Sequence, residues 1–193
     1  MRRAPAGRRS GGRRPTGRDL VAWVWLAVLL VVVVLVAFSS SGDAPEDVAV
    51  ATAECTLPAT GIELSGEQIA NARTIAQVGR DRGLPERAVV IALATAMQES
   101  TLRNLDHGDR DSLGLFQQRP SQGWGSPAQV QDPVYAAGIF YDRLVQVPGW
   151  DTGRLTEVAQ AVQRSGFPEL YQRWEGLAAE LATATSGGNS SCP

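Results

Sequence analysis

Apolar residues recur at helical spacing through much of the chain beyond residue 61. Ser65 followed by Gln68 has the pattern of a capping box, in which each side chain bonds a backbone N–H of the first helical turn. Apolar and small residues then follow at intervals of three and four as far as Gly79. Gly83 is a typical helix end. The pattern therefore predicts a helix that begins after Ser65 and ends at Gly83.

The next segment, 88–97, reads AVVIALATAM and is apolar around its whole helical circumference. Pro85 suits the first turn of this helix, because the N–H that proline lacks would have no intrahelical partner there. A helix that is apolar on every side is typical of the centre of a core. We therefore expect a buried central helix, and it ends in the polar residues Gln98, Glu99 and Ser100.

The rest of the domain is predicted to combine an irregular region with three further helices. Residues 104–133 are rich in Asp, Gly and Pro and show no sustained period. Helices are predicted over 133–147, 155–163 and 168–182. Strand signals are weak throughout, so the predicted fold class is mostly α.

A different pattern fills the N-terminal part. Residues 20–38 contain no charge, and at about 1.5 Å per residue they are long enough to cross a hydrocarbon core of about 30 Å. Residues 1–19 hold seven arginines, which the positive-inside bias keeps in the cytoplasm. We predict a basic cytoplasmic tail over 1–19 and a transmembrane signal anchor over 20–38, in a single-pass cell-membrane protein whose remaining part is extracytoplasmic. A cleaved signal peptide is the alternative, because a basic head and an apolar stretch also make one.

Composition and charge complete the domain plan. Residues 39–61 are rich in Ser, Gly, Pro, Ala and acids, which predicts a linker; the helical domain is expected over 62–184, with a tail over 185–193. Residues 39–193 hold 11 arginines against 19 acidic residues. Nucleic-acid binding needs a basic face, so no nucleic-acid partner is expected. The N-terminal arginines are expected to meet anionic lipid headgroups.

Cys55 and Cys192 are the only cysteines, and they bracket the outer domain. In an oxidising compartment this predicts one disulfide, which would contribute roughly 4 to 5 kcal/mol in the chain-entropy description; two free thiols are the alternative. The chain has no internal repeat, no paired CxxC and a single histidine.

Glu99 is the residue that this pattern singles out. Burial disfavours an ionised carboxylate and the negative end of the helix dipole acts in the same direction, so both are expected to raise its pKa. A carboxylic acid that stays protonated near neutral pH can protonate a glycosidic oxygen. A solvated glutamate at a frayed helix end is the alternative.

Three motifs follow one another in a recognisable order. They are QES at 98–100, GLFQQ at 114–118 and DPVYAAGIFYDRL at 132–144. Over about residues 65–178 this order resembles the lysozyme-like superfamily, in particular lytic transglycosylase (SLT-type) and goose-type lysozyme domains. A fourth motif departs, because the chain reads QRSG at 163–166 where the family has a Tyr-Asn-Ala-Gly type of turn. The aromatic and the amide that the family places near its acid are thus expected to be missing or replaced.

The resemblance implies a lysozyme-like fold that cleaves peptidoglycan glycan strands between N-acetylmuramic acid and N-acetylglucosamine. That cleavage needs no metal and no organic cofactor, so none is expected. Glu99 would be the single acid/base, which protonates the bridging oxygen and then takes a proton from the muramoyl C6 hydroxyl or from water. Ser100 would hold the glycan or orient Glu99, and Gln117 and Gln118 would contact an N-acetyl group. The membrane tether adds the expectation of a partner in an envelope machine.

Other residues are candidates for substrate contacts. Trp124, between two glycines, and Trp150 are candidate platforms for a sugar ring, and the alternative for each is a loop tryptophan packed on the core. Tyr141 is expected in the core unless its hydroxyl turns toward the groove. Asp109 and Asp111 are candidates for the second carboxylate that hydrolysis would need. The alternative is that they shape turns.

The remaining expectations concern residues with purely structural roles and alternative functions of the domain. Tyr171 and Trp174 are predicted to pack rather than to contact sugar, and His107 to be a solvated turn residue. The acidic loop lacks the glycine and terminal glutamate of an EF-hand, which disfavours a calcium loop. The main rival function is a lysozyme-like domain that has lost activity and binds glycan or an envelope protein, which the QRSG turn favours. A small-molecule or metal-related envelope protein is a third reading, disfavoured by the lack of clustered His and Cys.

Overall fold

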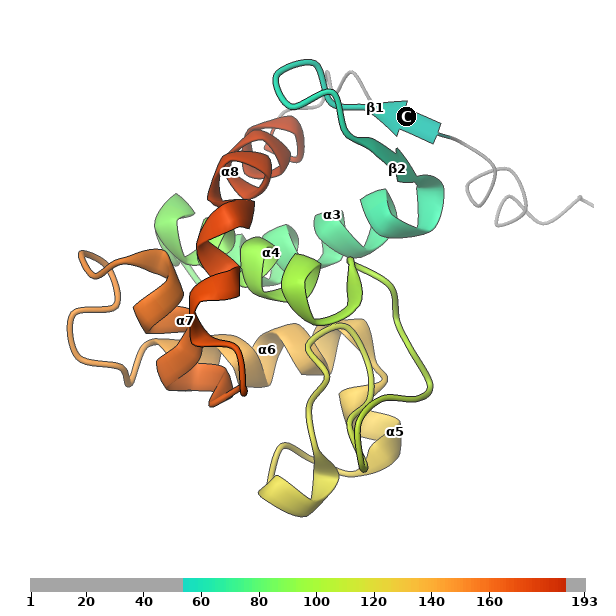
Figure 1. Ribbon diagram of the computed structural model, residues 1–193, viewed down its shortest axis with the longest axis vertical. Coiled ribbons are helices and arrows are strands. Elements are labelled where there is room, and N and C mark those ends of the chain that lie inside the picture. The colour runs from blue at the N-terminus through green and yellow to red at the C-terminus, as the bar shows by residue number, and fades with distance from the viewer. Residues whose placement is uncertain (1–53, 187–193) are drawn as a thin grey trace, which may run out of the picture. The chain divides into compact units, whose positions relative to one another are not determined.

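The computed structural model describes residues 54–186, all within the second of the two units into which the chain divides, 46–193. The predicted basic tail and the apolar stretch 20–38 lie outside the described residues, as does the end of the C-terminal tail. Within 54–186, no helix is both long enough and apolar enough to span a bilayer. The described part is mostly helical, as predicted (Figure 1).

The described part opens with a two-stranded antiparallel sheet. β1 (Glu54–Thr56) pairs with β2 (Glu63–Ser65), and Cys55 lies opposite Leu64. β1 falls inside the stretch 39–61 that was predicted to be a linker, so the folded domain begins before the predicted residue 62. Strands of three residues are too short to show alternation in a sequence, which is why the pattern missed them.

Cys55 is buried and disulfide-bonded. Its predicted partner, Cys192, lies outside the described residues.

Helix α3 (Gly66–Asp81) begins as the sequence predicts. The Ser65 hydroxyl accepts a hydrogen bond from the Gln68 backbone N–H at 3.4 Å, and the Gln68 side chain accepts one from the Ser65 N–H at 2.9 Å. The helix is capped at Arg82, and Gly83 follows with φ +66°, a conformation that glycine adopts at little cost. The capping box and the end at Gly83 are both confirmed.

Helix α4 (Glu86–Ser100) lies at the centre of the fold, with α3 and the later helices around it (Figure 1). Ten of its 15 residues are buried, which confirms the expectation of a central helix. Pro85 is the residue before the helix rather than part of its first turn. At the other end Thr101 and Leu102 both have positive φ, 54° and 61°, which is uncommon outside glycine and turns the chain sharply away from the helix axis.

The region predicted to be irregular contains two short helices, and the later helices follow the predicted order. Helix α7 has the predicted bounds, α6 ends three residues before the predicted end at 147, and the last predicted helix is a 3₁₀ segment followed by an α-helix. The elements after α4 are η1 (Pro120–Gln122), α5 (Pro127–Val130), α6 (Pro133–Leu144), α7 (Leu155–Gln163), η2 (Pro168–Trp174) and α8 (Glu175–Ala184).

The loop between α4 and α5 is fixed against α6 by packing. The Phe116 ring stacks on Phe140 of α6 with centroids 4.7 Å apart, and both are fully buried. Gly114 allows the same loop to approach α5, since a Cβ added there would lie 2.1 Å from the Val130 carbonyl oxygen. The part of the loop around Gly114–Phe116 is therefore packed into the core.

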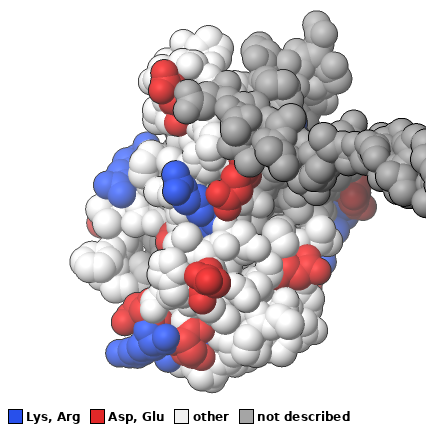
Figure 2. Space-filling model, turned by 90° about the vertical axis from the view of Figure 1, so that its right-hand side faces the viewer, with Lys and Arg blue, Asp and Glu red and all other residues white. Residues whose placement is uncertain are grey.

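Charged side chains are dispersed on the face drawn in Figure 2. Acidic and basic groups stand singly or in small groups of both signs on a mostly uncharged surface. A nucleic-acid interface needs a continuous basic face, and this face has none.

Candidate active site

A groove with a volume of about 1050 Å³ runs beside the end of α4. Its walls come from the end of α4, the loop before η1, α6 with the residues after it, and the end of α7. The lining is mainly polar, with Glu99, Gln117, Trp124, Arg143, Gln163 and Arg164 among its residues. The carboxylate that the sequence singled out therefore faces a large groove.

Tyr171 holds the Glu99 carboxylate. Its hydroxyl donates a hydrogen bond to Glu99 Oε1 at 2.6 Å, and the Tyr171 side chain is fully buried. Burial, together with the neighbouring Glu99 carboxylate, raises the pKa of the Tyr171 hydroxyl, so it stays a donor at any ordinary pH. The burial of Tyr171 agrees with the prediction that it packs rather than contacts sugar, but the sequence did not predict that its hydroxyl contacts the candidate acid.

The pKa of Glu99 is raised above its ordinary value of 4.5. Loss of hydration on burial is the main cause, while hydrogen bonds from Tyr171 and Gln163 act in the opposite direction and do not cancel it. The expected direction of the shift is confirmed. Glu99 therefore keeps its proton to a higher pH than a solvated glutamate, as a general acid must.

Gln163, the last residue of α7, supplies an amide beside Glu99. Its Nε2 donates to the Phe116 carbonyl at 2.7 Å, and the amide also bonds with the Glu99 carboxylate. Its Oε1 is buried without a partner among the described residues and can still accept a hydrogen bond. The QRSG turn thus places an amide beside Glu99, and Tyr171, eight residues further along the chain, places an aromatic side chain there.

The sequence contained a signal that could have identified Gln163 as a site residue, but none for Tyr171. Gln163 stands at the start of the QRSG turn, so matching its side-chain amide to the family's turn would have found it. Tyr171 lies 72 residues from Glu99, and only the packing of η2 against α4 brings the two together.

Ser100 fixes the end of the helix rather than lining the groove. It is buried, and its hydroxyl donates to the Leu115 carbonyl at 2.8 Å and to the Ala96 carbonyl at 3.1 Å. The predicted contact with glycan therefore does not fit its position. Its bond to Leu115 ties α4 to the loop that forms the opposite part of the site.

Two amides of α3 hold the chain immediately after α4. Gln68 Nε2 donates to the Thr101 carbonyl at 2.7 Å, and Asn71 Nδ2 donates to the Leu102 carbonyl at 2.8 Å. These bonds satisfy two carbonyls of the sharp turn at the helix end. The backbone that carries Glu99 is thus anchored from the side of α3.

The structure separates the two adjacent glutamines. Gln117 lines the groove, with φ 47°, and its Nε2 donates to the His107 and Gly114 carbonyls at 3.2 and 3.3 Å. Gln118 is buried in the core, where its Nε2 donates to the Ala136 carbonyl at 3.0 Å. Of this predicted pair, only Gln117 is placed to meet a substrate.

The candidate second carboxylates also differ. Asp111 accepts hydrogen bonds from Ser121 N and Arg119 Nε, both at 2.8 Å, and these partners hold the pKa of its carboxyl well below the usual range. Asp111 is not among the residues lining the groove, so the turn-shaping alternative describes it. Asp109 does line the groove, and its carboxylate lies 3.8 Å from Arg110 Nε.

His107 is exposed beside the same loop. Its Nδ1 lies 2.8 Å from Asp106 Oδ1, and this contact lowers the pKa of the Asp106 carboxyl. The expectation of a solvated turn residue is confirmed.

Of the aromatic candidates, only Trp124 lies at the groove. The Arg143 guanidinium stands 3.4 Å from the centre of its ring, so one face of the indole is already covered. Trp150 is packed against the core outside the groove lining, as its alternative reading held. Tyr141 is also buried, and its hydroxyl donates to the Ile75 carbonyl at 2.9 Å, so it does not turn toward the groove.

Trp174 supports the central helix from the same segment as Tyr171. Its Nε1 donates to Gln98 Oε1 at 3.0 Å, and Arg173 donates to the same oxygen at 3.0 Å. The residue beside Glu99 is therefore held by η2 as well, which confirms Trp174 as a packing residue.

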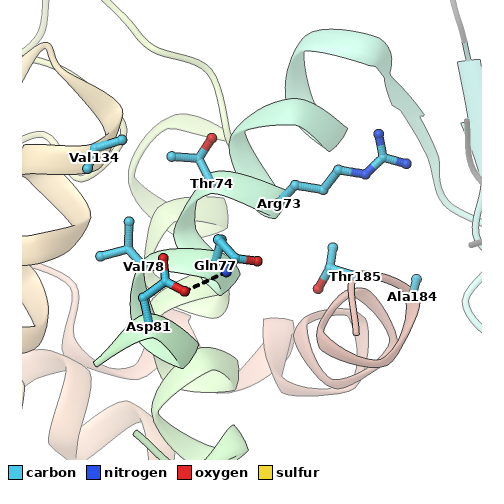
Figure 3. Close-up of a pocket in the computed structure, with 8 residues that line it drawn as sticks. All are labelled: Arg73, Thr74, Gln77, Val78, Asp81, Val134, Ala184 and Thr185. Carbon is cyan, nitrogen blue, oxygen red and sulfur yellow. Dashed lines mark hydrogen bonds between the residues drawn. The ribbon is translucent and has the colours of Figure 1, made fainter. Parts of the chain in front are cut away.

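Other kinds of site find little support within residues 54–186. These residues contain no cluster of three or more His, Cys, Asp or Glu side chains that could hold a metal ion. A smaller pocket of about 470 Å³ lies between α3, the end of α8 and Val134 (Figure 3). Its acidic residue, Asp81, is exposed and accepts a hydrogen bond from Gln77 at 2.6 Å, so no buried ionisable group faces this pocket.

No protein-family model matches the chain, and no curated protein gives a significant match.

Proposed function

We propose that this domain cleaves the glycan strand of peptidoglycan between N-acetylmuramic acid and N-acetylglucosamine, as a lysozyme-like lytic transglycosylase. The observation that supports this most is the state of Glu99. It is a half-buried carboxyl with a raised pKa, held by a buried tyrosine, on the wall of a long polar groove. The order of motifs around it, which resembles the lytic transglycosylases, gives the substrate class.

The proposed chemistry needs Glu99 in both protonation states. As an acid it donates its proton to the bridging glycosidic oxygen, and the bond from that oxygen to the muramoyl C1 breaks. As a carboxylate it then takes the proton of the muramoyl C6 hydroxyl, whose oxygen closes a 1,6-anhydro ring on C1. Because Tyr171 occupies Oε1, the other oxygen, Oε2, carries the proton that moves.

Tyr171 and Gln163 balance the acid between these two states. Burial alone would favour the neutral form throughout, while hydrogen bonds from the two side chains stabilise the carboxylate that appears after the first proton transfer. A single group that must give and then accept a proton works best with its pKa near the working pH. The arrangement around Glu99 supports that requirement.

Of the two carboxylates that hydrolysis was predicted to use, only Asp109 lines the groove. An inverting or retaining hydrolase uses a second carboxylate beside the scissile bond. Asp111 is engaged by Arg119 and Ser121 and does not line the groove. Asp109 remains the one candidate of the predicted pair, and we propose that it is not required.

The rival proposal, a glycan-binding domain without activity, rested on the replaced turn. The amide and the aromatic beside Glu99 support the active alternative. Anchoring by residues 20–38 with an extracytoplasmic domain, and an envelope partner, remain proposals from the sequence.

The test is to incubate the full chain with purified peptidoglycan and to analyse the released muropeptides by mass spectrometry. Glu99→Gln is the inactive variant, and Glu86→Gln, an exposed glutamate at the other end of α4, is the matched control. We expect anhydro products from the wild type and the control and none from Glu99→Gln. Products heavier by one water molecule would show that the domain is a hydrolase rather than a transglycosylase. No release by the wild type, under conditions in which a muramidase works, would refute the proposed activity.

A further inference from the structure

Four arginines line the groove, and they differ in whether a carboxylate lies close to them. Arg119 is paired with Asp111 at 2.8 Å, and Arg110 lies 3.8 Å from Asp109. The other two, Arg143 and Arg164, make no ion pair with any carboxylate of the described residues, although both line the groove. Two cationic side chains thus face the site of a proposed polymer substrate with no acidic partner.

Arg143 is held in place before any ligand arrives. Its guanidinium lies over the Trp124 ring at 3.4 Å, and its Nη2 donates to the Gly123 carbonyl at 2.8 Å. Stacking and one hydrogen bond fix the plane of the guanidinium and leave its other N–H groups free to donate. A side chain fixed in this way loses little conformational freedom on binding an anion.

Arg164 brings a second positive charge to the same stretch of wall. It caps α7 with φ 55°, directly after Gln163, and its side chain is exposed. Loss of hydration and then the charge of Arg164 lower the pKa of Arg143, so the two guanidinium groups repel each other. An oxyanion between them would relieve that repulsion and accept hydrogen bonds from both.

We propose that Arg143 and Arg164 form an anionic subsite that binds a carboxylate of the substrate beside Glu99. The proposal rests on the proposed function, because it takes peptidoglycan as the ligand of the groove. In that polymer the carboxylates stand on the muramic acid, either as the free lactyl group of a strand without peptides or within the stem peptide. A neutral polymer of N-acetylglucosamine has the same backbone and no such group.

The subsite has two consequences for recognition. Strands that contain muramic acid bind more tightly than chitin oligosaccharides of equal length, because only they carry the anion. The difference shrinks as salt is raised, since Arg164 is exposed and its charge is screened. Selection for the natural polymer then comes from electrostatics at one point of the groove rather than from the shape of the sugar ring.

The experiment measures binding with the full chain in the Glu99→Gln background, so that no probe is consumed. The probes are peptide-free glycan strands, strands with stem peptides and neutral chitin oligosaccharides, each titrated by calorimetry at low and high salt. Arg164→Gln is the main variant. Arg154→Gln, an arginine just before the other end of α7 and outside the groove lining, is the matched control.

We expect Arg164→Gln to weaken binding of the anionic strands about threefold, and Arg143→Gln together with Arg164→Gln to weaken it roughly tenfold or more. Binding of chitin oligosaccharides and of the Arg154→Gln control stays unchanged. A loss confined to peptide-bearing strands assigns the carboxylate to the stem, and a loss on peptide-free strands assigns it to the lactyl group.

Two outcomes separate this proposal from the proposed function. If the wild type releases anhydro products but the arginine variants bind all three probes as the background does, the subsite is refuted and the activity stands. If the arginine-dependent preference is seen while the wild type releases nothing from peptidoglycan, the subsite stands on a binding domain and the cleavage proposal fails.

Discussion

The hydrogen bond from Tyr171 to Glu99 can be tested by replacing Tyr171 with phenylalanine. The substitution keeps the buried ring and removes only the hydroxyl that donates to Glu99 Oε1 at 2.6 Å. A hydrogen bond to a charged group contributes about 1.5 to 3 kcal/mol, and one pKa unit corresponds to about 1.4 kcal/mol. Because this bond is stronger to the carboxylate than to the neutral acid, its loss is expected to raise the pKa of Glu99 further in the variant.

The sign of this shift decides the shape of the pH profile. A general acid must be protonated, so activity is lost as pH rises through the pKa of Glu99. In Tyr171→Phe that loss moves to higher pH, while the maximal rate falls about tenfold because the carboxylate formed by proton transfer is less stable. Muropeptide release measured from acid to alkaline pH gives both quantities.

A matched control is available in the same core. Tyr141 is equally buried, but its hydroxyl bonds the Ile75 carbonyl and does not reach Glu99. Tyr141→Phe therefore lowers stability without moving the alkaline limb. If Tyr171→Phe and Tyr141→Phe give the same pH profile as the wild type, the assignment of Tyr171 to the acid is wrong.

Three further predictions concern neighbouring residues. Because the pKa of Glu99 is raised in the folded state, its contribution to stability is complete below about pH 4.5 and is lost as pH rises through the folded pKa. The melting temperature of Glu99→Gln should therefore exceed that of the wild type near neutral pH, and this difference should disappear at acidic pH. Asp109→Asn is expected to form the same anhydro product at a rate within about twofold of the wild-type rate. Loss of turnover would instead show that Asp109 has a direct role. Ser100→Ala leaves the Leu115 carbonyl without its donor and should cost about 1 to 3 kcal/mol in urea unfolding.

Local patterns predicted the helices well because their signals are contained within short continuous stretches of the chain. The capping box of Ser65 and Gln68 needs only residues three apart, and the uniform apolar character of 88–97 implies a central helix without knowledge of its neighbours. The hairpin of β1 and β2 has no such signal, because two three-residue strands are defined only by their pairing.

The site was only partly predictable, because several of its contacts join residues that are far apart in the sequence. Glu99 could be found, because burial and position at a helix end are both visible in the sequence. Gln117 and Gln118 look alike as neighbours, yet Gln117 lines the groove and Gln118 bonds the Ala136 carbonyl in the core. Tyr171 reaches Glu99 only through tertiary packing, which no local spacing records.

The link between Tyr171 and Glu99 also has a consequence for the order in which the protein matures. The ribosome makes Tyr171 72 residues after Glu99, and Tyr171 lies in η2, which packs against α4. A nascent chain that ends before η2 would hold the acid with no tyrosine to stabilise its ionised form. The surroundings that Glu99 has in the folded domain are therefore complete only after synthesis has passed η2.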